Sequence, residues 1–382
     1  MARNPSAGLP PPPPIPFRHG LGNSLEMLRA ALGYLDVETT TGELAGLSGA
    51  AFRVYWPRPP GGVWDADVVS LGAFDPLAVA SETFGWKLLR YRETAPTVAW
   101  QFAVQALGRR QPLLASGLLE DGEEILVIGV RQEEQARLFE AVTRHVTEPV
   151  TIPCPREEPD APSPPLSVGL FEPIPPHRRI SREESMHRAL RRAVWVADVP
   201  PRRNDTGVAV GTEAYRAWIA TLLRPEPPGV AEAERLMRSS GLALPDEATA
   251  RDRVVVRHVL HRALSSYAEA RDWAVAFLES AQTGHRLDTP LACYRAEAKA
   301  LREAERLWPP VVVRSGEGFA LAPAPAGFDR PLWFEETVRC LRVAAETYAE
   351  ATAALDAAVP MLEQERIDPD AEDDEEGSDS SA

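Results

Sequence analysis

The amino-acid sequence changes its pattern at a proline-rich stretch, residues 154–176, which reads CPREEPDAPSPPLSVGLFEPIPP. Before this stretch, short amphipathic segments alternate with short apolar runs, which is typical of a mixed α+β unit. After it, apolar residues recur every three to four positions over long segments, as in a bundle of antiparallel helices. A chain of 382 residues is long enough for two such units. The pattern therefore predicts an α+β domain followed by an α-helical domain.

Proline and charge divide the rest of the chain. A run of prolines at 10–14 favours a stiff, extended arm. Eight acidic residues and no basic residue lie between Asp368 and Ala382, which predicts a solvated, disordered tail. The expected segments are a proline-rich disordered arm (1–16), an α+β domain (17–150), a proline-rich linker or crossover (151–180), a helical domain (181–365) and an acidic tail (366–382).

Composition excludes several classes of partner. The net charge is −15, and the part before the tail is acidic too, whereas binding to nucleic acid needs a basic patch. No apolar run reaches the roughly 18 residues of a membrane span, and from the proline-rich first residues we expect no signal peptide. The three cysteines, at 154, 293 and 340, are too few and too widely spaced for a disulfide framework or a zinc site. We expect a cytoplasmic protein with no cofactor and no metal.

Local patterns place the elements of each half. In the first half we expect helices at 23–34, 41–47, 76–84 and 97–109, strands at 51–56, 67–71 and 86–92, a hairpin of 111–117 with 124–131, and one more strand or helix in 132–145. In the second half we expect helices at 181–196, 211–223, 231–239, 250–280, 289–307 and 332–362, with a loop or small hairpin at 309–324.

The first expected helix carries the most specific packing prediction. Asn23 or Ser24 can cap it, and Leu25, Leu28 and Leu32 fall on one face. The strand after Glu124 offers an apolar face of its own, which includes Leu126 and Ile128. Because each buried leucine or isoleucine contributes roughly 1.5–3 kcal/mol, the two faces should pack together. The start of the helix should then lie beside the start of the strand.

Short motifs in the first half follow the order and spacing of a known family. They are His19-Gly20, Ser24-Leu25, Leu28-Arg29-Ala30-Ala31-Leu32-Gly33, Gly46-Leu47-Ser48-Gly49, Phe52, Tyr55, Gln111-Pro112-Leu113-Leu114 and Ile125-Leu126-Val127-Ile128-Gly129-Val130. On these motifs, residues 17–135 resemble the N-terminal domain of the butirosin biosynthesis protein H family, which is papain-like and related to bacteriocin-processing cysteine peptidases. The second half resembles the helical domain that often follows it, through residues 211–218 and the alanine-rich helices after Arg253.

The resemblance implies a papain-like fold and transfer of an acyl group from a carrier protein to an amine. It also implies a nucleophilic cysteine directly after His19 and a catalytic histidine at the start of the strand. Gly20 stands at the first position, and Glu123 or Glu124 stands at the second. The first 153 residues contain no cysteine at all. The thiolate chemistry of the family is therefore missing.

These observations leave open alternatives of different classes. The first is a non-catalytic papain-like binding protein, a pseudoenzyme without catalytic residues. Its cleft would be lined by Gly20, Asn23, Tyr55 and Glu124, and its partner would be a small metabolite, a peptide or an acyl-carrier-type protein. The second is a residual acyltransferase or amidase of specialised-metabolite biosynthesis, in which Ser24 attacks, His19 is the base and Glu124 orients the histidine. A third gives the helical half a purely structural or assembly role.

Overall fold

The structure is a computed structural model. It describes residues 6–13, 15–16, 21–57, 75–119, 124–133, 136–143, 148–155, 166–198, 208–223, 234, 237, 244–281, 287–315, 318–322 and 330–359. The acidic tail, the predicted strand at 67–71 and most of the predicted helix at 231–239 lie outside these residues.

The first half is mixed α+β, as the sequence predicts. Its elements are β1 (Ser6–Gly8), α1 (Leu21–Gly33), α2 (Thr41–Leu47), the short 3-10 helix η1 (Ala50–Phe52), β2 (Tyr55–Pro57), α3 (Pro76–Thr83), β3 (Trp86–Thr94), α4 (Pro96–Gly108), β4 (Leu113–Ser116), β5 (Ile125–Glu133), β6 (Ala136–Val142), β7 (Val150–Pro153) and β8 (Leu166–Pro173). The predicted hairpin is present as the antiparallel pair β4–β5. The segment 132–145, left open between strand and helix, contains the strand β6.

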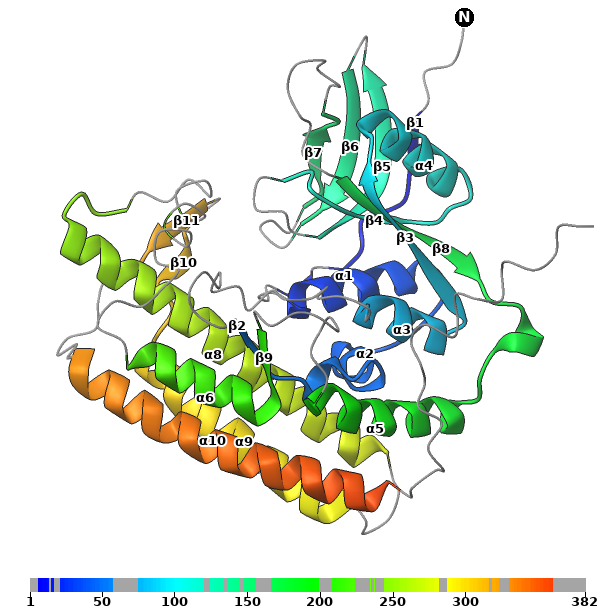
Figure 1. The fold of residues 1–382 in the computed structure, drawn as a ribbon. Helices are drawn as coiled ribbons and strands as arrows, with labels where there is room; N and C mark the ends of the chain where they lie inside the picture. Colours follow the sequence, from blue (N-terminus) through cyan, green and yellow to red (C-terminus); the bar gives the residue numbers. More distant parts are fainter. Residues whose placement is uncertain are drawn as a thin grey trace, which may run out of the picture.

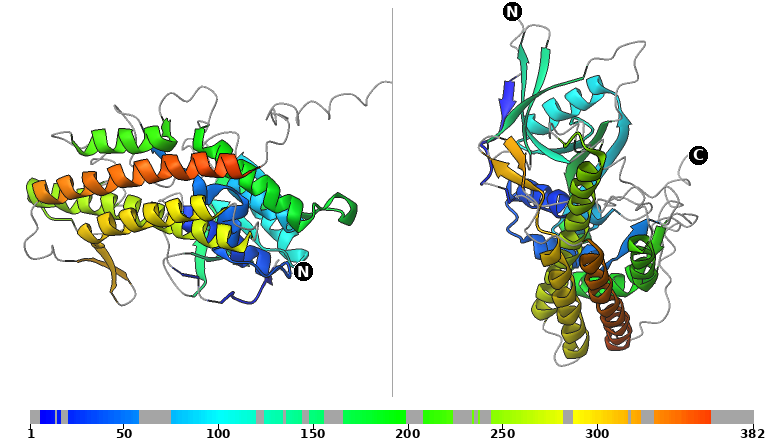
Figure 2. Two further views of the ribbon diagram at one scale, coloured as in Figure 1. Left: turned by 90° about the horizontal axis from the view of Figure 1, so that it is seen from below. Right: turned by 90° about the vertical axis from the view of Figure 1, so that its left-hand side faces the viewer.

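The second half is dominated by long helices. Its elements are η2 (Pro176–Arg178), α5 (Arg182–Asp198), β9 (Val208–Val210), α6 (Gly211–Leu222), α8 (Ala248–Ser280), α9 (Asp288–Leu307), β10 (Val312–Ser315), β11 (Gly318–Leu321) and α10 (Arg330–Ala358). Helices α8, α9 and α10 run side by side, with α6 against α10 (Figure 2). The hairpin β10–β11 lies where the sequence predicts a loop or small hairpin.

A seven-stranded antiparallel sheet lies at the end of the molecule opposite the long helices (Figure 1). Its order is β3-β8-β4-β5-β6-β7, and β1 pairs with β5. Successive residues of β4 point to opposite faces, because side chains alternate along a strand. Leu113 packs in a cluster with α4, whereas Leu114 packs in a cluster with α1. The two helices therefore cover opposite faces of the sheet.

Two predicted segments need correction. The linker expected at 151–180 contains β8, which pairs with both β3 and β4 inside the sheet. Residues 6–8 of the arm expected to be disordered form β1. The proline content of both segments hid short apolar runs such as Leu166–Pro173, where the prolines stand outside or at the end of the strand.

The larger hydrophobic core joins the two halves. Leu25 of α1 and Phe52 of η1 belong to the same buried cluster as Trp218 of α6, Phe277 of α8 and Leu341 of α10. Strand β2 of the first half pairs with β9 of the second half. Helices α1 to α3 therefore lie between the sheet and the long helices (Figure 1) and share a core with both.

The run 51–56 also needs correction, because only its end is a strand. Residues 50–52 form η1 after Gly49, whose φ of 78° lies in the left-handed region that glycine adopts most easily. Strand β2 begins at Tyr55. Phe52 packs edge-on against Phe277 and Tyr294 of the helical half, and this packing takes the chain away from a regular strand.

Candidate functional site

The start of α1 lies beside the start of β5, as predicted. Asn23 Nδ2 donates a hydrogen bond of 3.2 Å to the backbone oxygen of Glu124, and both residues are buried. Leu25, Leu28 and Leu32 have no exposed surface and belong to the same cluster as Leu126 and Ile128. The predicted packing of the helix face on the strand face is confirmed.

The role predicted for Asn23 and Ser24 as helix caps is wrong. Helix α1 already begins at Leu21, so both residues lie inside its first turn. The amide of Asn23 serves the contact with β5, 101 positions away, rather than the backbone of its own helix. A cap residue supplies its side chain to N–H groups that follow it, and Asn23 makes no such hydrogen bond within the described residues.

The carboxylate of Glu124 is held by Arg90 of β3. Arg90 Nη1 lies 2.8 Å from Glu124 Oε1, and Arg90 Nε lies 2.7 Å from Asp75 Oδ2. Asp75 also caps α3, since its Oδ1 accepts from the backbone nitrogen of Leu77 at 2.9 Å. We name Asn23, Asp75, Arg90 and Glu124 the Arg90 cluster. The cluster ties together the starts of α1, α3 and β5.

Electrostatics favour a permanently charged Arg90. Burial acts to lower the pKa of its guanidinium, but Glu124 and Asp75 outweigh that effect, and the net pKa is raised. The Glu124 carboxylate, at the start of β5, is stabilised by this ion pair with Arg90.

The serine-based alternative is not assembled in the described residues. Ser24 is 7% exposed and makes no hydrogen bond to a described histidine. His19 and Gly20 lie outside the described residues. Glu124, the proposed orienting acid, is engaged by Arg90. Ser24 therefore has no base in the described part of the chain, and an unactivated serine hydroxyl is a weak nucleophile.

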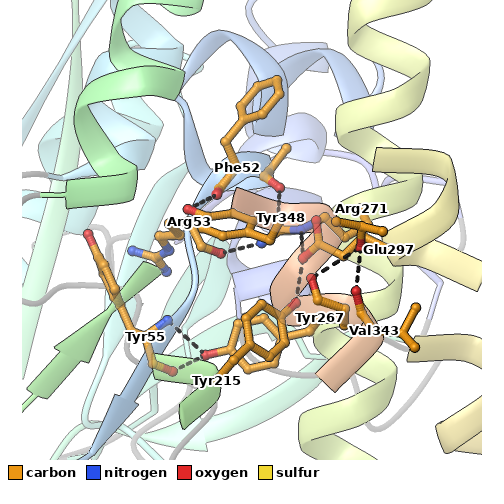
Figure 3. A network of polar contacts seen from close by, with 12 residues as sticks. Phe52, Arg53, Tyr55, Tyr215, Tyr267, Arg271, Glu297, Val343 and Tyr348 are labelled. Atoms are coloured by element: carbon orange, nitrogen blue, oxygen red, sulfur yellow. Dashed lines mark hydrogen bonds and ion pairs between the residues drawn. The ribbon is translucent and has the colours of Figure 1, made fainter. Parts of the chain in front are cut away.

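Tyr55, the remaining residue predicted for the cleft, ends a segment whose backbone is bound by the helical half (Figure 3). Five successive carbonyl groups, those of residues 51–55, accept hydrogen bonds from it. The donors are Arg271 (to Ala51 and Arg53), Tyr348 (to Phe52), the Gly211 backbone (to Val54) and Tyr267 (to Tyr55). These bonds satisfy a buried backbone that has no strand partner between 51 and 54.

The side chain of Arg53 does not join the hydrogen bonds that hold the backbone of this segment. Its guanidinium points away from Arg271 and lies over the Tyr55 ring, 5.1 Å from the ring centre (Figure 3). The residue is 7% exposed, and its side chain makes no hydrogen bond or ion pair with a described residue. Burial lowers the pKa of Arg53, while Tyr55, Tyr267 and Asp75 act to raise it.

Asp75 acts on both arginines of the site. It pairs with Arg90 directly and acts electrostatically on Arg53. Asn23 and Glu124 lie in the Arg90 cluster, whereas Tyr55 packs against the guanidinium of Arg53. The candidate site thus carries two arginines and two carboxylates.

The charged groups of the candidate site are largely engaged with one another. It holds no thiol, and its two carboxylates are both paired with Arg90. Across the described ranges, no three or more histidine, cysteine or acidic side chains gather as they would around a metal ion. None of the helices described is long and apolar enough to cross a bilayer.

Comparison with known proteins adds no relative. No protein-family model matches the chain, and no curated protein is significantly similar to it.

Sequence reasoning missed Arg90 and Arg53, although both leave a signal. Arg90 stands two positions after the buried Leu88 on β3, so it faces the same side of the strand. Arg53 interrupts the apolar run Ala51-Phe52-Arg53-Val54-Tyr55-Trp56. A charged residue on a buried face needs a compensating partner, so both arginines could have been predicted as candidate site residues from this pattern.

Proposed function

We propose that this protein is a non-catalytic binding protein with a papain-like N-terminal part, in which the former catalytic position serves as a recognition site. The single observation that carries the proposal is the fixed state of Glu124. Its backbone accepts from Asn23 at 3.2 Å, and its carboxylate pairs with Arg90 at 2.8 Å. These contacts commit Glu124 to Arg90 and Asn23 rather than to a nucleophile, which supports a binding role over a catalytic one.

The resemblance supports the same proposal from the sequence side. In the butirosin biosynthesis protein H family, a cysteine at the start of a helix faces a histidine at the start of a strand. The start of α1 lies against the start of β5 here, but Gly20 and Glu124 occupy the two positions. The ligand class that suits a small polar site is a metabolite or a peptide. An acyl-carrier-type protein as partner rests on the resemblance alone.

Covalent labelling tests the absence of catalysis. The full chain would be treated with an activated acyl probe and a fluorophosphonate, and its intact mass would be measured. We expect no stoichiometric adduct, because Ser24 has no base among the described residues. The matched control is Ser24→Ala. A stoichiometric adduct that this substitution abolishes would establish the acyltransferase or amidase alternative instead.

Restoring the missing pair tests the papain-like part. Gly20→Cys alone and Gly20→Cys with Glu124→His would be compared by the pH dependence of thiol alkylation. We expect a lowered thiol pKa only in the double variant, because a nearby imidazolium stabilises the thiolate. Circular dichroism would check that both variants fold. Identical profiles in two folded variants would argue against an inherited catalytic geometry.

A further inference from the structure

Arg53 is a buried cation without a counter-charge in contact. The residue is 7% exposed, its guanidinium lies over the Tyr55 ring, and its side chain makes no hydrogen bond or ion pair with a described residue. Arg271, the neighbouring arginine, shows the contrast. Arg271 has no exposed surface, but it pairs with Glu297 at 2.7 Å and donates to two backbone oxygens.

A cation in this state is costly to the folded protein. Transfer of an unpaired charge from water to a protein interior carries a large free-energy penalty, whereas a paired and hydrogen-bonded charge recovers much of it. No polar contact in the described part of the fold compensates for burying Arg53, because its side chain joins no two described elements by a hydrogen bond or an ion pair. An external anion would supply the missing partner.

We propose that Arg53 binds the carboxylate of a monoanionic ligand, with the Tyr55 ring beside it. A guanidinium presents two parallel N–H groups that match the two oxygens of a carboxylate. Nearby negative charge limits the charge of the ligand, because the Asp75 carboxylate already acts on Arg53. A phosphate dianion would meet this negative charge, while a carboxylate carries the least charge that still pairs with Arg53. The inference rests on the proposed binding function and names the ligand class.

Thermal unfolding in the presence of defined anions tests the proposal. The full chain would be unfolded in sodium acetate, sodium butyrate, sodium phosphate and sodium chloride at matched ionic strength. We expect its Tm to rise with acetate and butyrate concentration above the chloride series, because ligands that bind only the native state stabilise it. Phosphate should give a smaller rise. A Tm in acetate and butyrate that equals the chloride series, or a larger rise in phosphate, would overturn the assignment.

Variants separate binding at Arg53 from general salt effects. Arg53→Met should lose the carboxylate-specific rise, and its Tm without ligand should equal or exceed that of the parent. Arg53→Lys should keep the rise with affinity reduced by about tenfold or more, because an ammonium is a point charge without the fork. Arg342→Met, at an exposed position on α10, is the matched control and should leave the rise unchanged. An unchanged rise in Arg53→Met, or a ligand-free Tm lowered in both Arg53 variants, would refute the proposal.

A further comparison distinguishes a peptide C-terminus from a small carboxylic acid as the source of the carboxylate. A short peptide with a free C-terminus and the same peptide with a C-terminal amide would be compared with butyrate. Stabilisation by the free peptide beyond butyrate assigns a chain terminus, and stabilisation by butyrate alone assigns a small acid. Labelling of Ser24 would refute the non-catalytic function without affecting these readings, so the two failures are separable.

Discussion

Arg271 of α8 and Glu297 of α9 form an ion pair in which neither side chain has any exposed surface, with 2.7 Å between Nε and Oε1. Tyr215 of α6 donates to the same carboxylate oxygen, and Arg271 also donates to the carbonyls of Ala51 and Arg53 (Figure 3). Burial acts to lower the pKa of Arg271, but Glu297 outweighs it and keeps the guanidinium charged. One network thus fixes three helices and the segment that carries Arg53.

Breaking this pair should be strongly destabilising. Glu297→Gln or Arg271→Met leaves a buried charge unpaired, so we expect the free energy of unfolding to fall by about 3–5 kcal/mol in urea denaturation. The matched control is Arg302→Met, which removes a partly exposed pair with Asp272 and should cost about 0–1 kcal/mol.

The double variant Arg271→Met with Glu297→Leu refines this expectation. It should recover only part of the loss, because the carbonyls of Ala51 and Arg53 still lack their donor. Equal losses for the exposed and the buried pair would contradict the structural role assigned to the network.

Gly46 of α2 should not tolerate a side chain. A Cβ built there would lie 2.2 Å from the ring of Phe277 of α8, so a methyl group forces the two helices apart. We expect Gly46→Ala to cost about 1–3 kcal/mol in the free energy of unfolding, as overpacked cores do. Gly33→Ala, where nothing lies within 4 Å, should cost nothing. Adding Phe277→Leu to Gly46→Ala should restore part of the loss. Equal behaviour of the two glycines would show that the α2–α8 contact is not close.

Asn23→Ala should destabilise the protein more than the neighbouring Ser24→Ala. Asn23 Nδ2 is the donor to the buried oxygen of Glu124, and a buried acceptor without its donor costs about 1–3 kcal/mol. Ser24 makes no hydrogen bond within the described residues, so its hydroxyl should contribute about 0.5 kcal/mol or less. Urea denaturation of both variants measures the difference. A larger loss of stability for Ser24→Ala would contradict the role assigned to Asn23 as the donor that joins α1 to β5.

Residue patterns predicted the parts of the fold whose information is local. The leucine spacing of α1 and the apolar run after Glu124 gave both elements and their contact, because each pattern marks a buried face. Strand β8 escaped, since its apolar run stands among prolines. Most of the candidate site could not be predicted from residue patterns. The segment 51–55 is bound by Tyr267 and Tyr348, which follow it by 212 and 296 positions, and only folding brings such partners together.

His261 of α8 should make the protein sensitive to mild acid. Burial lowers its pKa below the ordinary value of 6.5 and Arg257 on the same helix acts likewise, while Glu305 and the backbone of Trp308 on the α9 side oppose this shift. The folded state therefore favours the neutral imidazole. As the pH falls through 6.5, the unfolded chain binds a proton before the folded chain does, so stability is lost with falling pH.

A histidine substitution isolates this contribution from that of the carboxylates. The free energy of unfolding would be measured in urea from about pH 7.5 to about pH 5.5 for the parent, His261→Gln and His177→Gln. His261→Gln should lose less stability than the parent over this range, because glutamine does not titrate. His177 lies at an exposed position, so His177→Gln serves as the matched surface substitution. Parallel profiles for the parent and His261→Gln would show that the folded and unfolded chains bind the His261 proton equally well, against the burial of this ring between α8 and α9.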